Sequence, residues 1–142
     1  MTSPAITQRL LDAVADPLHP GLEIEVAERG LVTVYLPLND GFIGNPWSGY
    51  VHGGVITTLL DKTTRAAALV WVEAGEAVLP LDLRIDHLAA TTASAGLLAR
   101  GRCTRLTATI AFVHGEVVDV LSGDVVANGV SSVLRTPEEA GA

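Results

Sequence analysis

The chain has 142 residues, of which 49% are hydrophobic, only 4% are aromatic and 18% are charged. This length predicts a single domain over residues 1–142, with a core over about residues 20–135 that needs no disulfide or metal. The net charge of −7 at pH 7 argues against a general nucleic-acid binder, and every apolar run ends before the roughly 18 residues that a membrane-spanning helix needs.

The first elements along the chain are a short helix and a hairpin. Residues 5–15 repeat apolar side chains at helical spacing, which predicts an amphipathic helix ended by the prolines that follow. Residues 21–28 alternate apolar and charged side chains, as a half-buried strand does. Residues 29–30, Arg-Gly, then predict a turn, and residues 31–36 predict the returning strand.

A loop and a long helix occupy the middle of the chain. Residues 38–50 are rich in Asn, Asp, Gly and Pro, which predicts a loop. A loop of this length indicates a functional role. Residues 52–73 predict the main helix, with Gly75 as its C-cap.

Four segments rich in β-branched or alternating residues follow, and each predicts a strand: residues 77–88, 95–105, 107–120 and 124–134. Residues 137–142 predict a frayed tail. A single long apolar helix must be covered by a sheet to bury its face. The sequence therefore predicts an α+β fold, in which an antiparallel sheet of about six strands covers one long helix, with a short helix at the N-terminus.

The start of the long helix concentrates the chain's chemistry. His52, Gly53 and Gly54 begin an otherwise apolar run that leads to Asp61, two turns further on. The first N–H groups of a helix have no internal partner, and the helix dipole favours negative charge there. Glycines also let a ligand approach the backbone closely. Each feature alone has a plainer reading, since a lone aspartate is more often solvated and a Gly-Gly pair is more often a turn. Their combination predicts a site for an anion or a polarised carbonyl oxygen.

A helical wheel divides this helix into two faces. The face that we expect to pack on the sheet contains Val55, Ile56, Leu59, Leu60, Thr63, Ala66, Ala67 and Val70. The face around Asp61 is small and mildly polar, and it contains Thr57, Thr58, Thr64, Arg65, Ala68 and Val72. A solvated face would carry several Lys and Glu, so we expect a second subunit to cover this one. Arg65 lies four residues after Asp61 and is placed to pair with its carboxylate.

These residues resemble a known family. Residues 44–46 (GNP) and 49–61 (GYVHGGVITTLLD) are similar to hotdog-fold acyl-CoA thioesterases of the phenylacetate-pathway (PaaI-like) type. Residues 81–88 (LDLRIDHL) resemble their first strand after the helix, and residues 105–113 (RLTATIAFV) resemble a central strand. The order of elements matches from about residue 20 to residue 135, so the resemblance implies the hotdog fold.

The resemblance also implies a reaction and the residues that perform it. An acyl-CoA is hydrolysed to free acid and coenzyme A, at a site on the interface of a homodimer that pairs into a homotetramer. Asp61 is the general base or the nucleophile, the Gly53 N–H polarises the thioester carbonyl, and His52 orients the site. Asn45, in the preceding loop, positions substrate or water.

Further residues are expected to contact the substrate. Gly54, Thr57 and Arg65 lie on the same helix as Asp61, and Arg102 and Arg105 are candidates for the coenzyme A phosphates.

Three positions depart from the family pattern. Asn45 lies seven residues before His52, one more than expected, and Arg65 stands where a small residue is expected. Pro80 stands near the place where some members carry a Ser or Thr hydroxyl that faces the aspartate.

Two other functions fit the same fold, because a fold does not determine chemistry. One is an acyl-CoA-binding protein without turnover, which the departures at Arg65 and Asn45 favour. The other is a dehydratase of hydroxyacyl thioesters that pairs His52 with Asp61. Release of free thiol from a panel of acyl-CoAs distinguishes the thioesterase from both.

No cofactor is expected other than coenzyme A as part of the substrate. His19, His87 and His114 are scattered without metal-ligand spacing, and no phosphate-binding or dinucleotide motif is present. The single cysteine, Cys103, fits a reducing compartment, and the N-terminus has no signal-peptide pattern. We therefore expect a cytoplasmic protein that acts on acyl-CoA without nucleic-acid or membrane partners.

Overall fold

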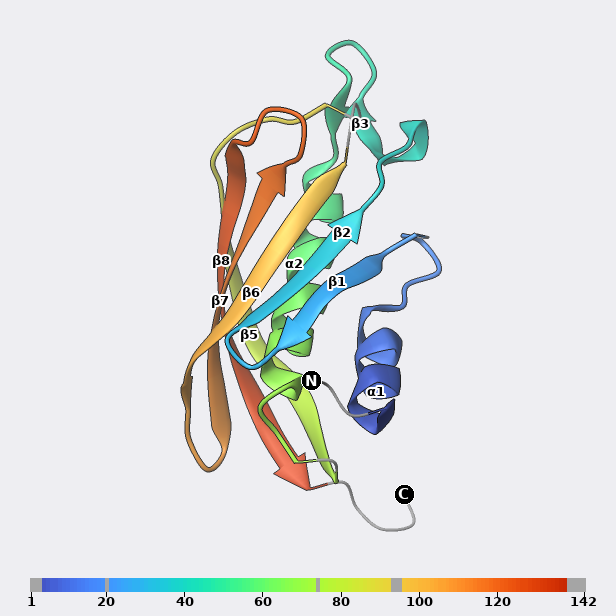
Figure 1. Ribbon diagram of the computed structural model, residues 1–142. Helices are drawn as coiled ribbons and strands as arrows, with labels where there is room; N and C mark the ends of the chain where they lie inside the picture. The colour runs from blue at the N-terminus through green and yellow to red at the C-terminus, as the bar shows by residue number, and fades with distance from the viewer. Residues whose placement is uncertain (1–3, 20, 74, 93–95, 138–142) are drawn as a thin grey trace.

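A computed structural model describes residues 4–19, 21–73, 75–92 and 96–137 (Figure 1). In chain order the elements are α1 (Pro4–Val14), β1 (Glu23–Glu28), β2 (Leu31–Leu36), the 3-10 turn η1 (Asp40–Phe42), β3 (Ile43–Asn45), β4 (Tyr50–Val51), α2 (Gly53–Leu69), β5 (Glu76–His87), β6 (Leu97–Leu106), β7 (Ile110–Asp119) and β8 (Val125–Pro137).

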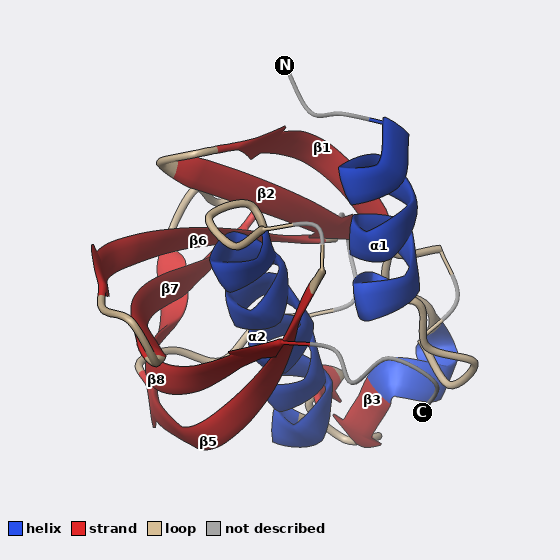
Figure 2. Ribbon diagram, turned by 90° about the horizontal axis from the view of Figure 1, so that it is seen from below, coloured by secondary structure: helices blue, strands red, loops and turns tan. Residues whose placement is uncertain are grey.

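Six of the strands form one sheet in the order β1-β2-β6-β7-β8-β5, and all of its neighbouring pairs are antiparallel. The sheet curves around α2, and α1 packs beside α2 at the end of the sheet that β1 forms (Figure 2). This is the hotdog arrangement that the sequence predicts. The strands β1 and β5 are the edges of the sheet, and Pro80 in β5 is therefore at a position where a missing N–H costs little.

A row of glycines across the sheet lets α2 lie close to it. Gly101 of β6 pairs with Gly115 of β7, which pairs with Gly129 of β8. A Cβ on Gly101 would lie 3.0 Å from the Thr63 carbonyl oxygen, and a Cβ on Gly115 would lie 3.0 Å from a methyl of Leu60. At Gly101 the nearest atoms are the backbone of Thr63 and the Cβ of Ala67, so this glycine sets how close α2 can lie to the sheet. By contrast, Gly115 and Gly129 face the flexible end of Leu60.

The predicted apolar face of α2 is confirmed as core. Its eight residues are all buried, and they join Val32, Val34, Leu97, Val113 and Val133 from the strands. The prediction for the opposite face is wrong in part, because Thr64, Ala68 and Val72 are also buried within this chain. Thr64 is covered in part by the sheet, since a Cβ on Gly115 would lie 3.4 Å from its methyl group, and α1 packs against the same helix.

The long helix ends earlier than its composition predicts. It stops at Leu69 with Val70 as C-cap, so the prediction of a helix to Glu73 with Gly75 as C-cap is wrong. The carbonyl of Val70 accepts a hydrogen bond from Arg29 Nε at 3.2 Å, and the Glu73 N–H donates to the Glu76 carboxylate at 2.7 Å. These partners stabilise a turn in place of a further helical turn.

The predicted loop over residues 38–50 is partly ordered. It contains η1 and a short hairpin of β3 and β4, in which Asn45 pairs with Tyr50. The four strands predicted after the helix are confirmed, with shifts of one to three residues at their ends. The start of the second of them, at residue 95, and the tail after Pro137 fall outside the described residues. Among the helices described, none is long and apolar enough to cross a membrane.

Candidate active site

His52 is the N-cap of α2. Its backbone is extended, with φ −62° and ψ 133°, and its ring Nδ1 accepts a hydrogen bond from the Gly54 N–H at 2.8 Å. Because Nδ1 acts as an acceptor, the proton of a neutral ring is on Nε2, which is thus a donor. The Gly54 N–H is therefore already used within the chain, and it is not free to bind a substrate.

The Gly53 N–H, by contrast, has no acceptor among the residues that the structure describes. Gly53 is the first residue of α2, so no helical carbonyl precedes it at hydrogen-bonding spacing. This N–H also lies at the positive end of the helix dipole. It is a preformed donor for a carbonyl oxygen that gains negative charge.

His87, at the end of β5, lies beside Gly53. Its ring Cε1 is 3.5 Å from the place that a Cβ on Gly53 would occupy, and its Nε2 is 3.9 Å from that place. From the sequence, the alternation of His87 with Ile85 predicts a strand-surface or cleft residue. Its position beside the helix start depends on the register of β5 with β8, which no local pattern reveals.

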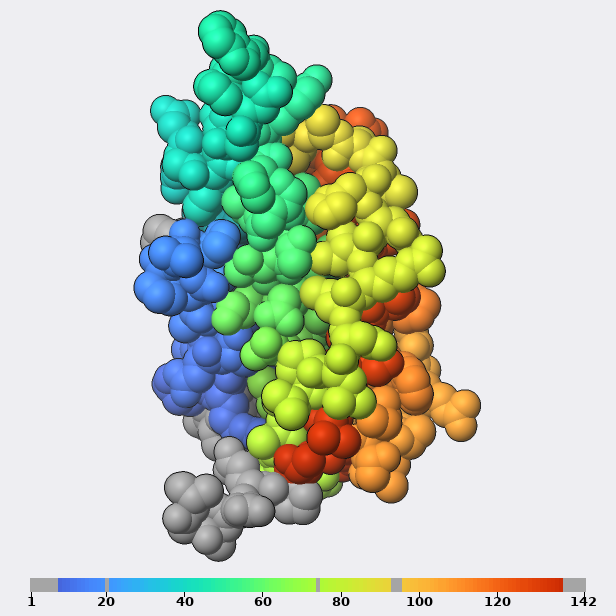
Figure 3. Space-filling model, turned by 180° about the vertical axis from the view of Figure 1, so that it is seen from behind, coloured from blue at the N-terminus to red at the C-terminus, as the bar shows by residue number. Residues whose placement is uncertain are grey.

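Asp61 and Arg65 form a two-point ion pair on the exposed side of α2. Arg65 Nε is 3.3 Å from Asp61 Oδ1, and Arg65 Nη2 is 3.1 Å from Oδ2. The Asp61 side chain is 27% exposed and the Arg65 side chain is 36% exposed. Figure 3 shows that part of α2 is exposed as a strip of surface between α1 and β5. Thr57 is exposed in the same region, and its hydroxyl donates to the Gly53 carbonyl at 3.2 Å.

Gly53 and Asp61 are too far apart to act on one carbonyl within a single chain. Eight residues separate them, which corresponds to about 12 Å along the axis of a helix. A carbonyl oxygen hydrogen-bonded to the Gly53 N–H would therefore lie well beyond the reach of the Asp61 carboxylate of the same chain.

Asn45 has a local structural role. Its side-chain oxygen accepts from the Trp47 N–H at 3.0 Å, and its backbone carbonyl accepts from the Gly49 N–H at 2.9 Å. Both contacts stabilise the turn of the β3–β4 hairpin. The amide of Asn45 is exposed at this turn, and it is used there as a turn-forming group.

A cavity of about 560 Å³ lies next to His52. His52, Gly54 and Val55 line it from the start of α2, and the loop around Phe42 lines its other side. The ring of Phe42 stacks on His19, with 5.4 Å between ring centres. The cavity gives a ligand space directly beside the His52 side chain.

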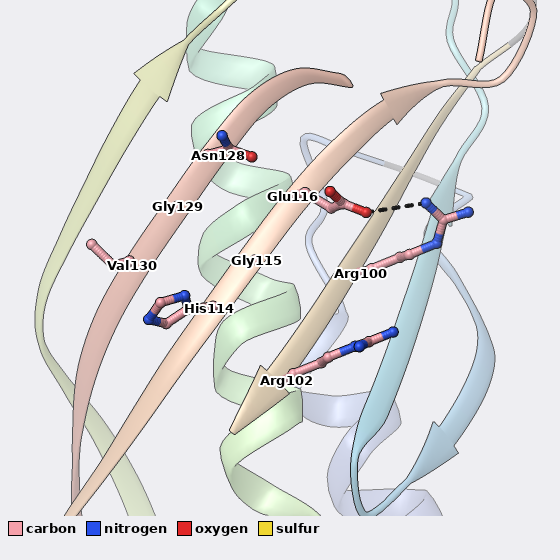
Figure 4. A pocket seen from close by; sticks show the side chains of 8 residues that line it. All are labelled: Arg100, Arg102, His114, Gly115, Glu116, Asn128, Gly129 and Val130. Atoms are coloured by element: carbon pink, nitrogen blue, oxygen red, sulfur yellow. Dashed lines mark hydrogen bonds and ion pairs between the residues drawn. The ribbon is translucent and has the colours of Figure 1, made fainter. Parts of the chain in front are cut away.

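The two arginines predicted for coenzyme A lie elsewhere. Gly101 faces α2, so its neighbour Arg102 points to the outer face of the sheet. Arg105 is exposed, and its cross-strand partner Phe112 is exposed as well. A cavity of about 460 Å³ on that face is lined by Arg100, Arg102, His114, Gly115, Glu116, Asn128, Gly129 and Val130 (Figure 4). Arg100 pairs there with Glu116 at 3.2 Å. Within one chain, the sheet separates Arg102 and Arg105 from Asp61.

Other titratable groups do not add a second centre. Over the described ranges, no three His, Cys, Asp or Glu side chains are grouped so that they could hold a metal. Burial raises the pKa of the Cys103 thiol, and its Sγ contacts the carbonyl of Arg105 at 3.4 Å. A thiol with a raised pKa is a poor nucleophile, so Cys103 is a small strand residue, as its sequence context indicates.

Comparison with known proteins identifies the family. The profile of the thioesterase superfamily matches residues 48–124, which include His52, Gly53, Asp61 and Arg65. The 1,4-dihydroxy-2-naphthoyl-CoA hydrolase of Listeria monocytogenes is 31% identical over an alignment of 91 residues, and the match covers 61% of this chain and 72% of that protein.

Solved structures share the fold. A phenylacetic acid degradation-related protein of Ralstonia eutropha superposes with a TM-score of 0.72 at 24% identity, covering 94% of this chain and 92% of its own. A Streptococcus mutans protein bound to acetyl-CoA superposes with a TM-score of 0.69 at 26% identity, covering 84% of this chain and 92% of its own. The family resemblance carried by the His52 motif is thus confirmed.

Proposed function

Because this chain belongs to the thioesterase superfamily, we propose that it hydrolyses an acyl-CoA thioester to a free acid and coenzyme A. The observation that carries the proposal is the Gly53 N–H at the start of α2, for which the described part of the chain offers no acceptor. A thioester carbonyl gains negative charge when it is attacked. A preformed donor at that oxygen typically accelerates acyl transfer by about 10²–10³.

The reaction needs two copies of the chain. Since Gly53 and Asp61 of one chain are about 12 Å apart along the helix, the carbonyl bound at Gly53 of one protomer is attacked beside Asp61 of another. Part of α2 is exposed between α1 and β5 (Figure 3), and the Asp61 side chain is 27% exposed, so a second chain would have access to this helix. The protein is therefore proposed to act as a homodimer or a larger assembly of dimers.

In the proposed mechanism, Asp61 acts on the carbonyl carbon in one of two ways. As a general base, it takes a proton from a water molecule whose oxygen attacks the carbonyl. As a nucleophile, it attacks directly, and water then hydrolyses the mixed anhydride. In both cases the carbon–sulfur bond breaks and coenzyme A leaves as a thiolate that takes up a proton. His52 holds the helix start in place through Gly54 and presents Nε2–H to the substrate.

A second candidate function is acyl-CoA binding without turnover. The observation that favours it is the two-point contact of Arg65, which occupies one lone pair on each oxygen of Asp61. A carboxylate held in this way has fewer positions from which it can accept a proton from water.

The test is release of free thiol from short, long and aromatic acyl-CoAs. Asp61→Asn removes the base while keeping the size of the side chain, so it should abolish turnover. Asp12→Asn, on the exposed side of α1, is the matched control and should retain it. Wild-type protein that binds acyl-CoA but releases no thiol would leave only the binding function.

A further inference from the structure

The most exposed large side chain near the site is Trp47, at the tip of the β3–β4 hairpin. It is 96% exposed, in a chain with only two Trp, two Tyr and two Phe residues. The other tryptophan, Trp71, is half-buried, and its ring packs against the Arg29 guanidinium at 5.4 Å. An indole that is left in water forgoes most of the burial that makes tryptophan useful in a fold. Trp47 thus has a large aromatic face that the described part of the chain leaves open to a ligand.

The turn that carries Trp47 is held firmly. The Trp47 N–H donates to the Asn45 side chain, and the Gly49 N–H donates to the Asn45 carbonyl. Pro46 restricts the backbone before Trp47, and Gly49 takes the left-handed conformation, with φ +71°, that closes the turn. The ring thus sits on a rigid support that projects beyond the start of α2 (Figures 1 and 3).

The hairpin is joined directly to the proposed site. Gly44 in β3 packs on His52 so closely that a Cβ there would be 3.0 Å from His52 Cβ. The His52 N–H also donates to the Phe42 carbonyl at 2.8 Å, and β4 leads into α2 within two residues. The position of the Trp47 turn is therefore fixed relative to the Gly53 N–H.

We propose that Trp47 is a stacking platform for the adenine ring of the coenzyme A substrate. This inference rests on the proposed function, which places the thioester at Gly53. The nucleotide is at the other end of the flexible pantetheine arm, so it remains at the surface, where Trp47 is. Indole rings bind nucleobases by stacking on their flat faces without hydrogen-bond readout. Tyr50, 47% exposed on the same hairpin, adds a second aromatic ring.

Kinetics with two forms of the substrate tests the platform. Trp47→Ala should raise the KM for an acyl-CoA by about tenfold and leave kcat near the wild-type value. For the matching acyl-pantetheine, which lacks the nucleotide, the same variant should leave KM unchanged. An equal rise in KM for both substrates would mean that Trp47 contacts the acyl group or the arm, and it would overturn the proposal. An unchanged KM for acyl-CoA would overturn it as well.

Tryptophan fluorescence gives a readout that does not depend on turnover. In a Trp71→Phe protein, Trp47 is the only indole, and coenzyme A and adenosine 3′,5′-bisphosphate should both quench it, whereas pantetheine should not. In Trp47→Phe, which keeps only Trp71, coenzyme A should cause no quenching. The contrary result is that the Trp71→Phe protein emits like a buried indole before ligand is added and shows no change with coenzyme A. That result would show that a second copy covers Trp47, and it would overturn the proposal. Quenching by coenzyme A in a protein that releases no thiol would uphold the platform while refuting hydrolysis.

Discussion

Arg65 binds both carboxylate oxygens of Asp61, through Nε at 3.3 Å and Nη2 at 3.1 Å, from one helical turn further along α2. An arginine that contacts a carboxylate at two points fixes the plane of that carboxylate as well as balancing its charge. A carboxylate offers about four lone-pair positions, so two remain for water or substrate. We interpret Arg65 as the residue that positions Asp61 for the reaction.

Replacement of Arg65 should therefore lower kcat more than it alters stability. Arg65→Met should reduce kcat about tenfold or more, because small errors in the position of a catalytic group are costly. The loss in unfolding free energy should be only about 0.3–0.5 kcal/mol, as for other half-exposed pairs at this helical spacing. Thiol-release kinetics and urea unfolding measure the two effects. Arg65→Lys keeps the charge without the two-point contact, so its kcat should lie between those of wild type and Arg65→Met. A rise in kcat for Arg65→Met would instead identify Arg65 as an inhibitor of Asp61.

The Gly53 N–H can be removed without disturbing the helix. Gly53→Pro deletes this donor at the first helical position, where proline is well tolerated. The extended backbone of His52 also suits a residue before proline. We expect kcat to fall by about 10²–10³, while Gly53→Ala, which keeps the N–H, stays much closer to wild type. Equal losses in both variants would show that the added bulk beside His87, and not the donor, is responsible.

Mixing two inactive variants tests whether two chains share a site. In a mixture of Gly53→Pro and Asp61→Asn chains, half of the dimers are mixed and each has one intact site, so about a quarter of wild-type activity should return. Measurement of thiol release before and after subunit exchange gives the answer. Absence of any recovery after proven exchange would place Gly53 and Asp61 in separate functions.

Gly101 should not tolerate a side chain. Gly101→Ala would place a Cβ 3.0 Å from the Thr63 carbonyl oxygen and 3.0 Å from Ala67 Cβ, neither of which moves without α2. Overpacking of this kind typically costs about 1–3 kcal/mol of unfolding free energy. Gly75→Ala meets no atom within 4 Å and is the matched control, with a change near zero. Chemical denaturation of both variants measures the difference, and equal stability would contradict the close contact.

Acid should weaken the fold through Glu76. Its hydrogen bonds to the Arg135 guanidinium, and to the backbone N–H of Glu73, hold the pKa of Glu76 below its ordinary value of 4.5. A carboxylate with a lowered pKa in the folded state adds stability above the unfolded value, and this contribution is lost as pH falls through the folded value. Wild type should therefore exceed Glu76→Gln in stability at neutral pH, and the gap should narrow below pH 4.5. Thermal unfolding of both proteins across that pH range measures the difference in stability, and Glu25→Gln, at an exposed position, is the control. A difference that stays constant with pH would show that the Glu76–Arg135 pair does not titrate there.

Local patterns were sufficient to predict some of these features. Helical periodicity assigned the buried face of α2 correctly, and the residue types of His52 and Gly53 were enough to place the helix start. The early end of α2 was missed because Arg29, which donates to the Val70 carbonyl, comes from a distant part of the chain, and because the local contact of the Glu73 N–H with the Glu76 carboxylate interrupts no apolar pattern. Thr64 and Ala68 were expected to face a partner, since small residues give no indication of how far a curved sheet extends around a helix. The contact of His87 with Gly53 depends on strand register, which has no signature in a single sequence.

The close seating of α2 on the glycine row has a consequence for how this protein would respond to dilution. Gly53 and Asp61 lie on one helix, which fixes their spacing within each chain, and the close contact of Gly101 with this helix limits its movement against the sheet. A site shared by two chains is then aligned only by how those chains dock. By mass action, the fraction of chains that are docked on a partner depends on the protein concentration. Turnover per chain would fall at concentrations where protomers separate, even while every protomer remains folded.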